Sequence, residues 1–359
     1  MNDGPHSAPQ RSSPRGIDDA GVTAWFRTHA PDAVAPLAYE LIAGGHSNLT
    51  FSVTDQADHR WVLRRPPLGQ VLATAHDMSR EHRIISALAS TDVPVAPTLG
   101  LCTDETVNGA PFYVMDFVDG TVVRGHAEAE RLSLDQRRRA SESIVDVLAS
   151  IHDVDVAAVG LDDLGRHEGY IERQLKRWYS QFQGSCAQVE GMSFPQVDEA
   201  FATLSAGIPP QQGTSIVHGD YRLDNCMLDE SGAVSAVLDW EICTLGDPLA
   251  DVGLLSVYWA DPGGDAVLPN ASPTAMDGFF RKSEVLDRYA TTSGRDLSDI
   301  NFYVAFGYWK LTCIIAGVYA RYAGGAMGNV PPEQVTGFAD MVGSLAEWTD
   351  TRTREWSTS

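Results

Sequence analysis

A single stretch, Val217–Asn225, constrains the fold of this chain more than any other feature. It reads Val-His-Gly-Asp-Tyr-Arg-Leu-Asp-Asn, and Asp239 follows fourteen residues after Asn225. Asp220 is placed to orient an attacking hydroxyl and accept its proton, while Asn225 and Asp239 offer oxygen ligands to Mg²⁺. Taken singly, Asp220 and Asp224 would be ordinary turn residues and Asn225 a helix cap. Their combination favours phosphoryl transfer, because its catalysis consists of positioning and charge neutralisation.

The segment after this stretch is expected to form a β-hairpin. Cys226–Leu228 and Val234–Leu238 are short apolar runs separated by the turn sequence Asp-Glu-Ser-Gly. If the strands pair tightly across that turn, Asn225 lies opposite Ala236, and Asp239 lies about 10 Å further along at roughly 3.3 Å per residue. Both side chains would then emerge at the same end of the hairpin, as a shared metal site requires.

From His218 to Asp251 the sequence resembles the aminoglycoside phosphotransferase and choline kinase superfamily, which shares the protein-kinase-like fold. The run Leu245–Asp251, Leu-Gly-Asp-Pro-Leu-Ala-Asp, carries part of this resemblance. More narrowly the chain is similar to the acyl-CoA-dehydrogenase-associated phosphotransferases, from about Leu41 to beyond Tyr258. The resemblance implies an α+β, bilobal fold with a small, mainly β N-terminal lobe and a larger, mainly α C-terminal lobe.

The resemblance also implies roles for individual residues. Asp220 would be the catalytic base, and Asn225 and Asp239 would hold the metal. The residues that support the catalytic loop would be His218, Asp247 and Asp251. His-Gly-Asp stands where protein kinases have His-Arg-Asp, and Asp-Trp-Glu where they have Asp-Phe-Gly. Because that arginine pairs with an activation-loop phosphate, regulation of this type is not expected.

A nucleotide-binding segment is expected near the N-terminus. Residues 41–53 read as strand, glycine turn and strand. Gly44 and Gly45 would let backbone N–H groups approach a polyphosphate closely, and Ser47 and Asn48 would add donors. Neither G-x-G-x-x-G nor a P-loop sequence occurs. Taken alone, the glycine pair is more often a simple hairpin turn.

An ion pair is expected between the next strand and the helix that follows it. Trp61–Pro67 is a strand with two arginines, and Arg64 stands at the place of the phosphate-pairing lysine of protein kinases. On a helix over residues 80–88, Glu81 falls on the apolar face. A carboxylate there needs a cationic partner. Arg64 is the candidate and Arg65 remains possible; the alternative is that Glu81 is a solvated charge.

The stretch Phe112–Gly120 is an apolar strand that runs into an Asp-Gly breaker. By the resemblance it is the inter-lobe hinge, whose backbone pairs with the adenine edge. The hinge residues would be Met115, Asp116, Phe117 and Val118. The apolar pattern by itself fits any buried strand equally well.

The organisation of the chain follows from these assignments. Residues 1–16 read as a disordered tail without the apolar core of a signal peptide, 17–118 as the ATP-binding lobe, and 119–359 as the catalytic and acceptor-binding lobe. The most apolar later segment, Phe302–Tyr322, contains Lys310, so a buried helix is expected there and not a membrane span.

Helical apolar spacing predicts most of the second lobe. The expected helices are Ser141–His152, Tyr170–Phe182, Leu249–Trp259, Phe279–Thr291, Phe302–Tyr322 and Pro332–Trp348. His152 ends the first of them and is expected to cap or pack there, not to act in catalysis.

The net charge and the cysteine content limit which classes of partner and which cellular compartment are expected. A net charge of −22, from 48 acidic and 26 basic side chains, counts against nucleic acid and against an anionic membrane. It would steer a cationic acceptor such as an aminoglycoside or choline toward the protein. The basic run Arg137–Arg139 could meet a CoA phosphate or form a solvated helix face. Five scattered cysteines without a C-x-x-C pair indicate a reducing cytoplasm.

The sequence therefore predicts an ATP- and Mg²⁺-dependent O-phosphotransferase, similar to the aminoglycoside phosphotransferases, that acts on a hydroxyl of a small molecule. The alternative from the narrower resemblance is a hydroxyacyl-CoA kinase. An alternative of another class is a non-catalytic nucleotide-binding module, which is disfavoured because the base, metal ligands and phosphate-binding residues are all present. A metal-dependent hydrolase built on His218 and Asp220 lacks further ligands at usable spacing.

Overall fold

The structure is a computed structural model, and it describes residues 13–43, 48–68, 77–263, 272–325 and 331–358. The chain divides into two compact units. Unit 1 comprises Met1–Ala89 and Val95–Val118, and unit 2 comprises Ser90–Pro94 and Asp119–Ser359. Of the expected tail, residues 1–12 lie outside the described part, whereas the Gly16 carbonyl accepts a hydrogen bond from Arg65.

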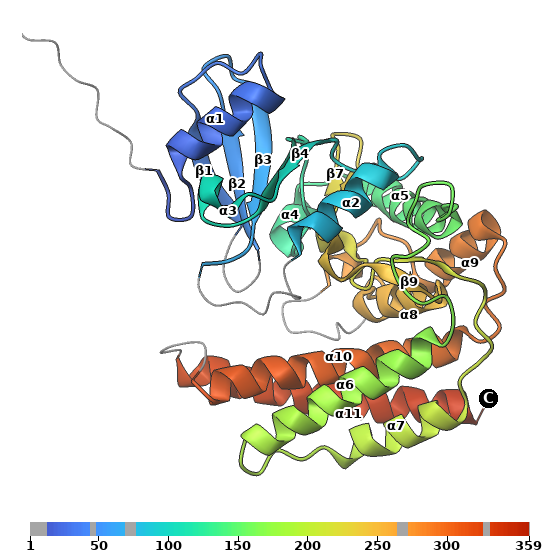
Figure 1. The fold of residues 1–359 in the computed structure, drawn as a ribbon. Coiled ribbons are helices and arrows are strands. Elements are labelled where there is room, and N and C mark those ends of the chain that lie inside the picture. Colours follow the sequence, from blue (N-terminus) through green and yellow to red (C-terminus); the bar gives the residue numbers. More distant parts are fainter. Residues whose placement is uncertain (1–12, 44–47, 69–76, 264–271, 326–330, 359) are drawn as a thin grey trace, which may run out of the picture. The chain divides into compact units, whose positions relative to one another are not determined.

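Unit 1 is built on one antiparallel sheet of five strands in the order β1-β2-β3-β5-β4 (Figure 1). The strands are β1 (Ala38–Ala43), β2 (Leu49–Thr54), β3 (Arg60–Arg65), β4 (Thr98–Cys102) and β5 (Phe112–Asp116). The helices of this unit are α1 (Asp19–His29), α2 (Met78–Leu88) and α3 (Glu105–Asn108). Helix α1, which the sequence analysis does not predict, packs Val22, Trp25 and Phe26 onto the core with Phe51 and Phe112.

Unit 2 is mainly helical. Its helices are α4 (His126–Glu130), α5 (Leu134–Asp153), α6 (Tyr170–Gln188), α7 (Pro195–Ala206), α8 (Leu249–Tyr258), α9 (Lys282–Ser293), α10 (Ile300–Ala323) and α11 (Pro332–Ser357). Two small sheets pair β6 (Ser215–Val217) with β9 (Thr244–Gly246) and β7 (Cys226–Leu228) with β8 (Val234–Val237). Short 3₁₀ turns are η1 (Leu223–Asn225), η2 (Trp240–Ile242) and η3 (Pro273–Ala275). The expectation of a mainly β and a mainly α part is confirmed.

The predicted helices of unit 2 are all present, with shifted ends. Helix α5 starts seven residues earlier than predicted, because Ser133 and Gln136 form a capping box at Leu134. Helix α9 starts only at Lys282, three residues after the predicted Phe279. Helix α7, which begins with Pro195, was not predicted. Helices α6, α7, α10 and α11 lie side by side in unit 2 (Figure 1).

Helix α10 is the core of unit 2. Among the described residues it is the one helix long and apolar enough, by length and composition, to cross a membrane, and 67% of its most apolar window is buried inside the protein. Tyr308 and Leu311 of α10 form a core cluster with Val257 of α8 and Leu345 of α11. The expectation of a buried helix over this segment agrees with that packing.

The hairpin β7–β8 has a different register from the expected one. Met227 lies opposite Ala236, and the Asn225 carbonyl accepts the N–H of Leu238 at 2.8 Å. The expected pairing of Asn225 with Ala236 is wrong by two residues, because Leu228 pairs with Val234 and not with Ala233, and an irregularity between Met227 and Leu228 adds one more residue to the other strand. Asp239 therefore directly follows the residue that hydrogen-bonds to Asn225, which brings the two proposed ligands closer along the hairpin than expected.

Two glycines allow α8 and α10 to cross closely. A Cβ on Gly253 would lie 2.3 Å from the Tyr303 carbonyl oxygen, and a Cβ on Gly307 would lie 3.3 Å from the Gly253 carbonyl carbon. These distances leave no room for a side chain at position 253. The two backbones can pack at this separation only with glycine there.

We expect Gly253→Ala to lower the free energy of unfolding by about 1–3 kcal/mol, because the added methyl group forces α8 and α10 apart. The matched control is Gly184→Ala in α6, where a Cβ meets no atom within 4 Å. That change should leave stability unchanged or raise it by up to about 1 kcal/mol. Urea unfolding of both variants measures the difference; an equal effect at the two sites would contradict the close crossing.

Candidate active site

The loop after β6 turns sharply at Gly219. This residue has φ +86°, a left-handed conformation that favours glycine, and a Cβ there would lie 3.1 Å from Cδ1 of Ile242. His218, directly before it, is fully buried. The tight turn carries the chain from the buried end of β6 to Asp220, whose side chain is 29% exposed.

Asp251 in α8 holds the start of this loop. Its Oδ2 accepts the N–H of His218 at 2.7 Å, and its Oδ1 accepts the N–H of Gly219 at 2.9 Å. Burial alone would raise the pKa of the Asp251 carboxyl, but hydrogen bonds from His152 and from the N–H of Gly219 hold that pKa below its ordinary value. An ionised carboxylate thus binds two successive backbone N–H groups, which supports the role expected for Asp251.

The His218 side chain supports the other side of the loop. Its Nε2 lies 2.9 Å from the Leu238 carbonyl oxygen, and its Nδ1 lies 3.3 Å from the backbone nitrogen of Asp220. The network therefore assigns the proton to Nε2, which donates to Leu238, and leaves Nδ1 to accept the Asp220 N–H. The imidazole of His218 thus connects the backbone of Leu238, directly before Asp239, with the backbone of Asp220.

His152, at the end of α5, contributes more than the expected packing. Its Nε2 lies 3.4 Å from Oδ2 of Asp251, and its Nδ1 lies 2.7 Å from the Tyr289 hydroxyl. Burial lowers the pKa of His152 below its usual value, against the opposing effect of Asp251. The neutral ring donates to Asp251 and accepts from Tyr289. His152 thus orients the carboxylate that holds the loop.

Asp247 has a second structural role behind the loop. Its Oδ2 accepts the Tyr303 hydroxyl at 2.7 Å, and its Oδ1 accepts the N–H of Leu249 at 3.1 Å. Burial raises the pKa of Asp247, opposed by these two hydrogen bonds. Because Tyr303 belongs to α10 and Leu249 begins α8, Asp247 joins the two helices. This contact fits the supporting role expected for Asp247.

Asp220 and Asn225 contact one another directly. The Asn225 Nδ2 donates to the Asp220 carbonyl oxygen at 2.8 Å and to its Oδ2 at 2.9 Å. Because the amide is planar, its oxygen Oδ1 points to the opposite side of the group. The amide nitrogen thus orients the proposed base, and the amide oxygen remains as the ligand atom expected of Asn225.

Asp239 lies at the end of the hairpin in a left-handed backbone conformation, with φ +63° and ψ +62°. Such a conformation is uncommon outside glycine and is typical of functional sites. It is half-buried and contributes, with Asp220 and Asp224, to the negative potential around Arg222. Asp220 and Asp224 pair with Arg222, and the proposed ligand atoms of Asn225 and Asp239 are both oxygen. These residues fit Mg²⁺.

Arg222 was missed by the sequence analysis. Its Nε lies 3.0 Å from Oδ1 of Asp224 and 3.4 Å from Oδ2 of Asp220, and its guanidinium lies 4.8 Å from the Tyr258 ring centre. The signal for it was available, because Arg222 stands inside the motif between the two carboxylates. Its charge offsets part of the repulsion between Asp220 and Asp224.

In unit 1 the expected ion pair is present. Arg64 Nε lies 3.2 Å from Oε2 of Glu81, whose side chain is 2% exposed. Arg65 does not compete for Glu81, because its guanidinium donates to the carbonyl oxygens of Gly16 and Asn108. Arg64 on β3 is thus the arginine that Glu81 of α2 fixes, as the sequence analysis proposed.

The structure describes only some of the other residues that are expected to contact the nucleotide. Gly44, Gly45 and Ser47 lie outside the described residues, and Asn48 is buried. At the hinge, the sheet ends at Asp116, two residues before Val118 and earlier than the apolar run suggested.

The hinge backbone is partly engaged within unit 1. The N–H of Asp116 donates to Pro97 at 2.8 Å, and that of Phe117 donates to Arg60 at 3.3 Å. The Arg60 guanidinium also lies 4.0 Å from the centre of the Phe117 ring. The N–H groups of Asp116 and Phe117 are thus occupied, and Met115 belongs to β5, which pairs with β3 and β4. Met115, the remaining hinge residue, is half-buried.

The basic run Arg137–Arg139 is not a uniformly solvated face. Arg137 is buried and donates to the carbonyl oxygens of Ala129 and Asp277 at 3.1 and 2.8 Å. Arg138 and Arg139 both pair with Glu142, at 3.4 and 3.8 Å. The expectation of a solvated face is wrong for Arg137, because its guanidinium ties α4 to the segment before α9.

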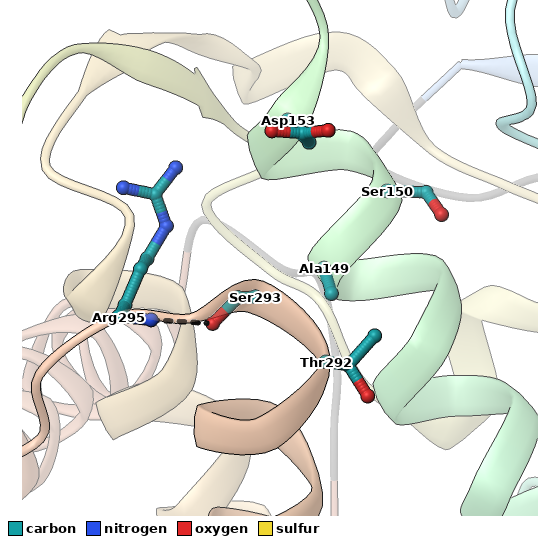
Figure 2. A pocket seen from close by; sticks show the side chains of 6 residues that line it. All are labelled: Ala149, Ser150, Asp153, Thr292, Ser293 and Arg295. Atoms are coloured by element: carbon teal, nitrogen blue, oxygen red, sulfur yellow. Dashed lines mark hydrogen bonds between the residues drawn. The ribbon is translucent and has the colours of Figure 1, made fainter.

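A cavity of about 220 Å³ lies apart from these residues. Figure 2 shows its lining side chains, which come from the end of α5 and the end of α9. They are Ala149, Ser150, Asp153, Thr292, Ser293 and Arg295. Arg295 also donates to the His152 carbonyl oxygen at 2.9 Å. The lining contains neither the proposed base nor a proposed metal ligand, so we place the chemistry at Asp220 and not in this cavity.

The model of the phosphotransferase enzyme family matches residues 38–272 of this chain. A curated relative from Mus musculus, acyl-CoA dehydrogenase family member 10, is 34% identical over 306 residues, which cover 84% of this chain and 28% of that protein. This chain spans well under half the length of the curated relatives it matches.

Two solved structures show the same fold. A Ralstonia eutropha protein assigned as an aminoglycoside phosphotransferase has a TM-score of 0.78 and 34% identity, covering 94% of this chain and 99% of that one. Choline kinase from Cryptosporidium parvum has a TM-score of 0.64 at 12% identity, covering 94% and 98%. The first match confirms the expected protein-kinase-like bilobal fold, and the second supports the fold alone.

The neutral, buried state of His152 predicts a loss of stability in acid. Because its folded-state pKa lies below 6.5, the unfolded chain takes up the proton first as the pH falls. Stability present at neutral pH is therefore lost below about 6.5, by up to roughly 1.4 kcal/mol for each unit of pKa difference. Glutamine does not titrate in this range, so the free energy of unfolding of His152→Gln should fall less than that of the wild type between pH 7.5 and 5.5, as measured by urea unfolding. A larger loss in the variant would mean that His152 is charged in the folded protein.

Proposed function

This chain belongs to the phosphotransferase enzyme family, and on that premise we propose that it transfers the γ-phosphate of ATP, with Mg²⁺, to a hydroxyl of a small molecule. The observation that carries the proposal is the fixed position of Asp220. Its backbone is held by His218 and its side chain by Asn225. A carboxylate positioned in this way, and still 29% exposed, can accept a proton from an incoming hydroxyl.

The reaction follows from the residues of unit 2. Asp220 orients the acceptor hydroxyl and takes its proton as the hydroxyl oxygen bonds to the γ-phosphorus, while the bond from that phosphorus to the β,γ-bridging oxygen breaks and ADP leaves with the electron pair. Asn225 and Asp239 would hold Mg²⁺, which when bound neutralises charge on the phosphate oxygens. Arg222 lies beside Asp220 and adds positive charge near the transferred phosphoryl group.

Unit 1 would bind the nucleotide. Arg64, fixed by Glu81, presents a planar guanidinium that can bind two phosphate oxygens at once. The N–H of Val118 would donate to the adenine edge, since those of Asp116 and Phe117 are engaged within unit 1. Solved structures of this fold have been described with ATP in one case and GDP in another, so the choice of ATP is part of the proposal.

For the acceptor, we infer an acidic hydroxylated molecule of the hydroxyacyl-CoA kind. The guanidinium of Arg177, on the exposed side of α6, lies 5.4 Å from the Trp178 ring centre, and Lys310 lies 5.9 Å from the same ring. Lys310 is buried whereas Arg177 is exposed, and an exposed guanidinium would bind an anionic group of the acceptor. The curated relatives named as acyl-CoA dehydrogenases support an acyl-CoA acceptor.

The function is tested by incubating the purified chain with Mg-ATP and a panel of hydroxylated acceptors, and by measuring ADP release and phosphorylated product. The panel contains hydroxyacyl-CoA thioesters, the corresponding free hydroxy acids, choline and aminoglycosides. Transfer to a hydroxyacyl-CoA supports both the reaction and the acceptor. Transfer only to aminoglycosides would keep the reaction and overturn the acceptor class. No transfer to any of them, with ATP bound, would favour a nucleotide-binding module.

We also infer that the protein works in a reducing compartment such as the cytoplasm. The five cysteines all lie in the described part of the chain, where they form no disulfide bond, and four of them are buried. Burial raises the pKa of Cys226 to about 12, which keeps that thiol protonated and unreactive.

Asp220→Asn should lower kcat on the order of 100- to 10,000-fold while Mg-ATP still binds, because the base acts on the acceptor. Asp239→Ala is the matched variant, and it should weaken nucleotide binding in the presence of Mg²⁺ far more than without it. Calorimetry with and without Mg²⁺, combined with steady-state kinetics, distinguishes the role of a base from that of a metal ligand. Near wild-type turnover of Asp220→Asn would remove this carboxylate from the mechanism.

Arg64→Ala and Glu81→Ala should each raise the KM for ATP. Because Glu81 acts through Arg64, the free energy lost in the double variant should be clearly smaller than the sum of the two single losses. Arg64→Lys should restore only part of the activity, since an ammonium group lacks the planar fork. Arg65→Ala is the control and should lower stability with little effect on KM, because Arg65 binds Gly16 and Asn108. Strict additivity of the first pair would contradict the proposed role of Glu81.

A further inference from the structure

Lys310 is a charged residue in the most buried helix of the protein. It lies in α10 between Trp309 and Leu311, and it is 5% exposed. A buried ammonium group is unfavourable unless it is bound by polar partners. Its Nζ donates to the carbonyl oxygen of Gly219 at 2.9 Å and lies 5.9 Å from the centre of the Trp178 ring. The charge therefore faces the catalytic loop, and an indole lies beside it.

The bond to Gly219 acts on the peptide group that carries Asp220. The carbonyl of Gly219 and the N–H of Asp220 belong to the same planar unit. Lys310 binds this unit at the oxygen, and His218 Nδ1 lies 3.3 Å from its nitrogen. With both ends held, the plane cannot rotate, and the direction in which the Asp220 side chain leaves the backbone is set.

The same glycine is held from its other side by Asp251. The Gly219 N–H donates to Asp251 Oδ1 at 2.9 Å, so an anion binds the N–H of Gly219 and a cation binds its carbonyl oxygen. Desolvation lowers the pKa of Lys310, and the carboxylates of Asp251 and Asp220 oppose this effect. A glycine alone has wide backbone freedom. The two charges remove that freedom at position 219.

We propose that Lys310 is a positioning residue for phosphoryl transfer, which orients the base Asp220 by fixing the Gly219–Asp220 peptide plane. This inference rests on the proposed function for its catalytic consequence and on the hydrogen bond at Gly219 for its structural one. Lys310 acts through Gly219 and not on the reacting atoms. An apolar side chain of similar length would pack as well in α10 but would leave the Gly219 carbonyl without its donor.

The variants for the test are Lys310→Met, Lys310→Arg and Thr312→Val. Methionine keeps the length of the side chain and removes the charge and the donor. Arginine restores a donor with a different shape. Thr312 is the matched control, because it is also buried in α10 but its hydroxyl bonds to Tyr308 and Thr349, away from the loop.

The first measurement is amide hydrogen exchange over residues 218–222, which does not require activity. Lys310→Met should speed exchange there by roughly tenfold or more, as expected for loss of a charged hydrogen bond. Thr312→Val should leave it unchanged. Unchanged exchange in Lys310→Met would overturn the proposal. If that variant does not fold, Lys310→Leu replaces it, which also lacks a donor, and exchange at the wild-type rate would overturn the proposal in the same way.

The second measurement uses the acceptor panel. Lys310→Met should lower kcat roughly 10- to 100-fold, as for a misplaced catalytic group, with the KM for ATP near the wild-type value. Lys310→Arg should recover part of the loss. A proportional fall of kcat and of ATP binding in Lys310→Met would indicate general loss of folded protein and would overturn the proposal. If the wild type transfers no phosphate, the proposed function fails, while the exchange result still decides whether Lys310 positions the loop.

Discussion

The carboxylate of Asp251 is the contact on which the catalytic unit depends. It binds the N–H groups of His218 and Gly219, and it is buried where no water can replace either partner. Removing one partner from such a group leaves a buried charge or an unsatisfied donor, which costs more than the bond itself contributes. His152, at the end of α5, also donates a hydrogen bond to this carboxylate. The position of Asp220 thus depends on Asp251 of α8 and on its contact with His152 of α5.

Much of this unit could be predicted from the sequence, because the signals were local. The motif around Asp220 and the helical spacing of apolar residues depend on neighbours a few residues apart. The register predicted for the hairpin was wrong, because an irregularity between Met227 and Leu228 changes the pairing of the strands without changing the apolar pattern. Lys310 reaches Gly219 across 91 positions and Tyr289 reaches His152 across 137. No local pattern encodes such contacts, so these supports could be found only in the structure.

The crossing of α8 and α10 connects stability with catalysis. Gly253 stands two residues after Asp251, and Gly307 stands three residues before Lys310. The helices approach at these glycines, and the two charges that hold Gly219 lie within one turn of the approach on each helix. Since packed helices shift as rigid elements, a change that separates α8 from α10 should move both charges away from the loop. The glycines therefore contribute to the geometry of the base as well as to the core.

The net charge of −22 and the cations near the loop act over different distances. At physiological ionic strength, charges farther apart than about 8 Å are largely screened. The overall charge of the chain therefore influences solubility and encounter but has little weight in the choice of an acceptor that is already bound. Arg177 and Lys310 lie within 6 Å of the Trp178 ring, and the latter contacts the loop directly. Because Lys310 is buried against Gly219, its charge acts on the loop backbone at short range, where screening is weak, and Asp220 and Asp224 pair with Arg222 beside it.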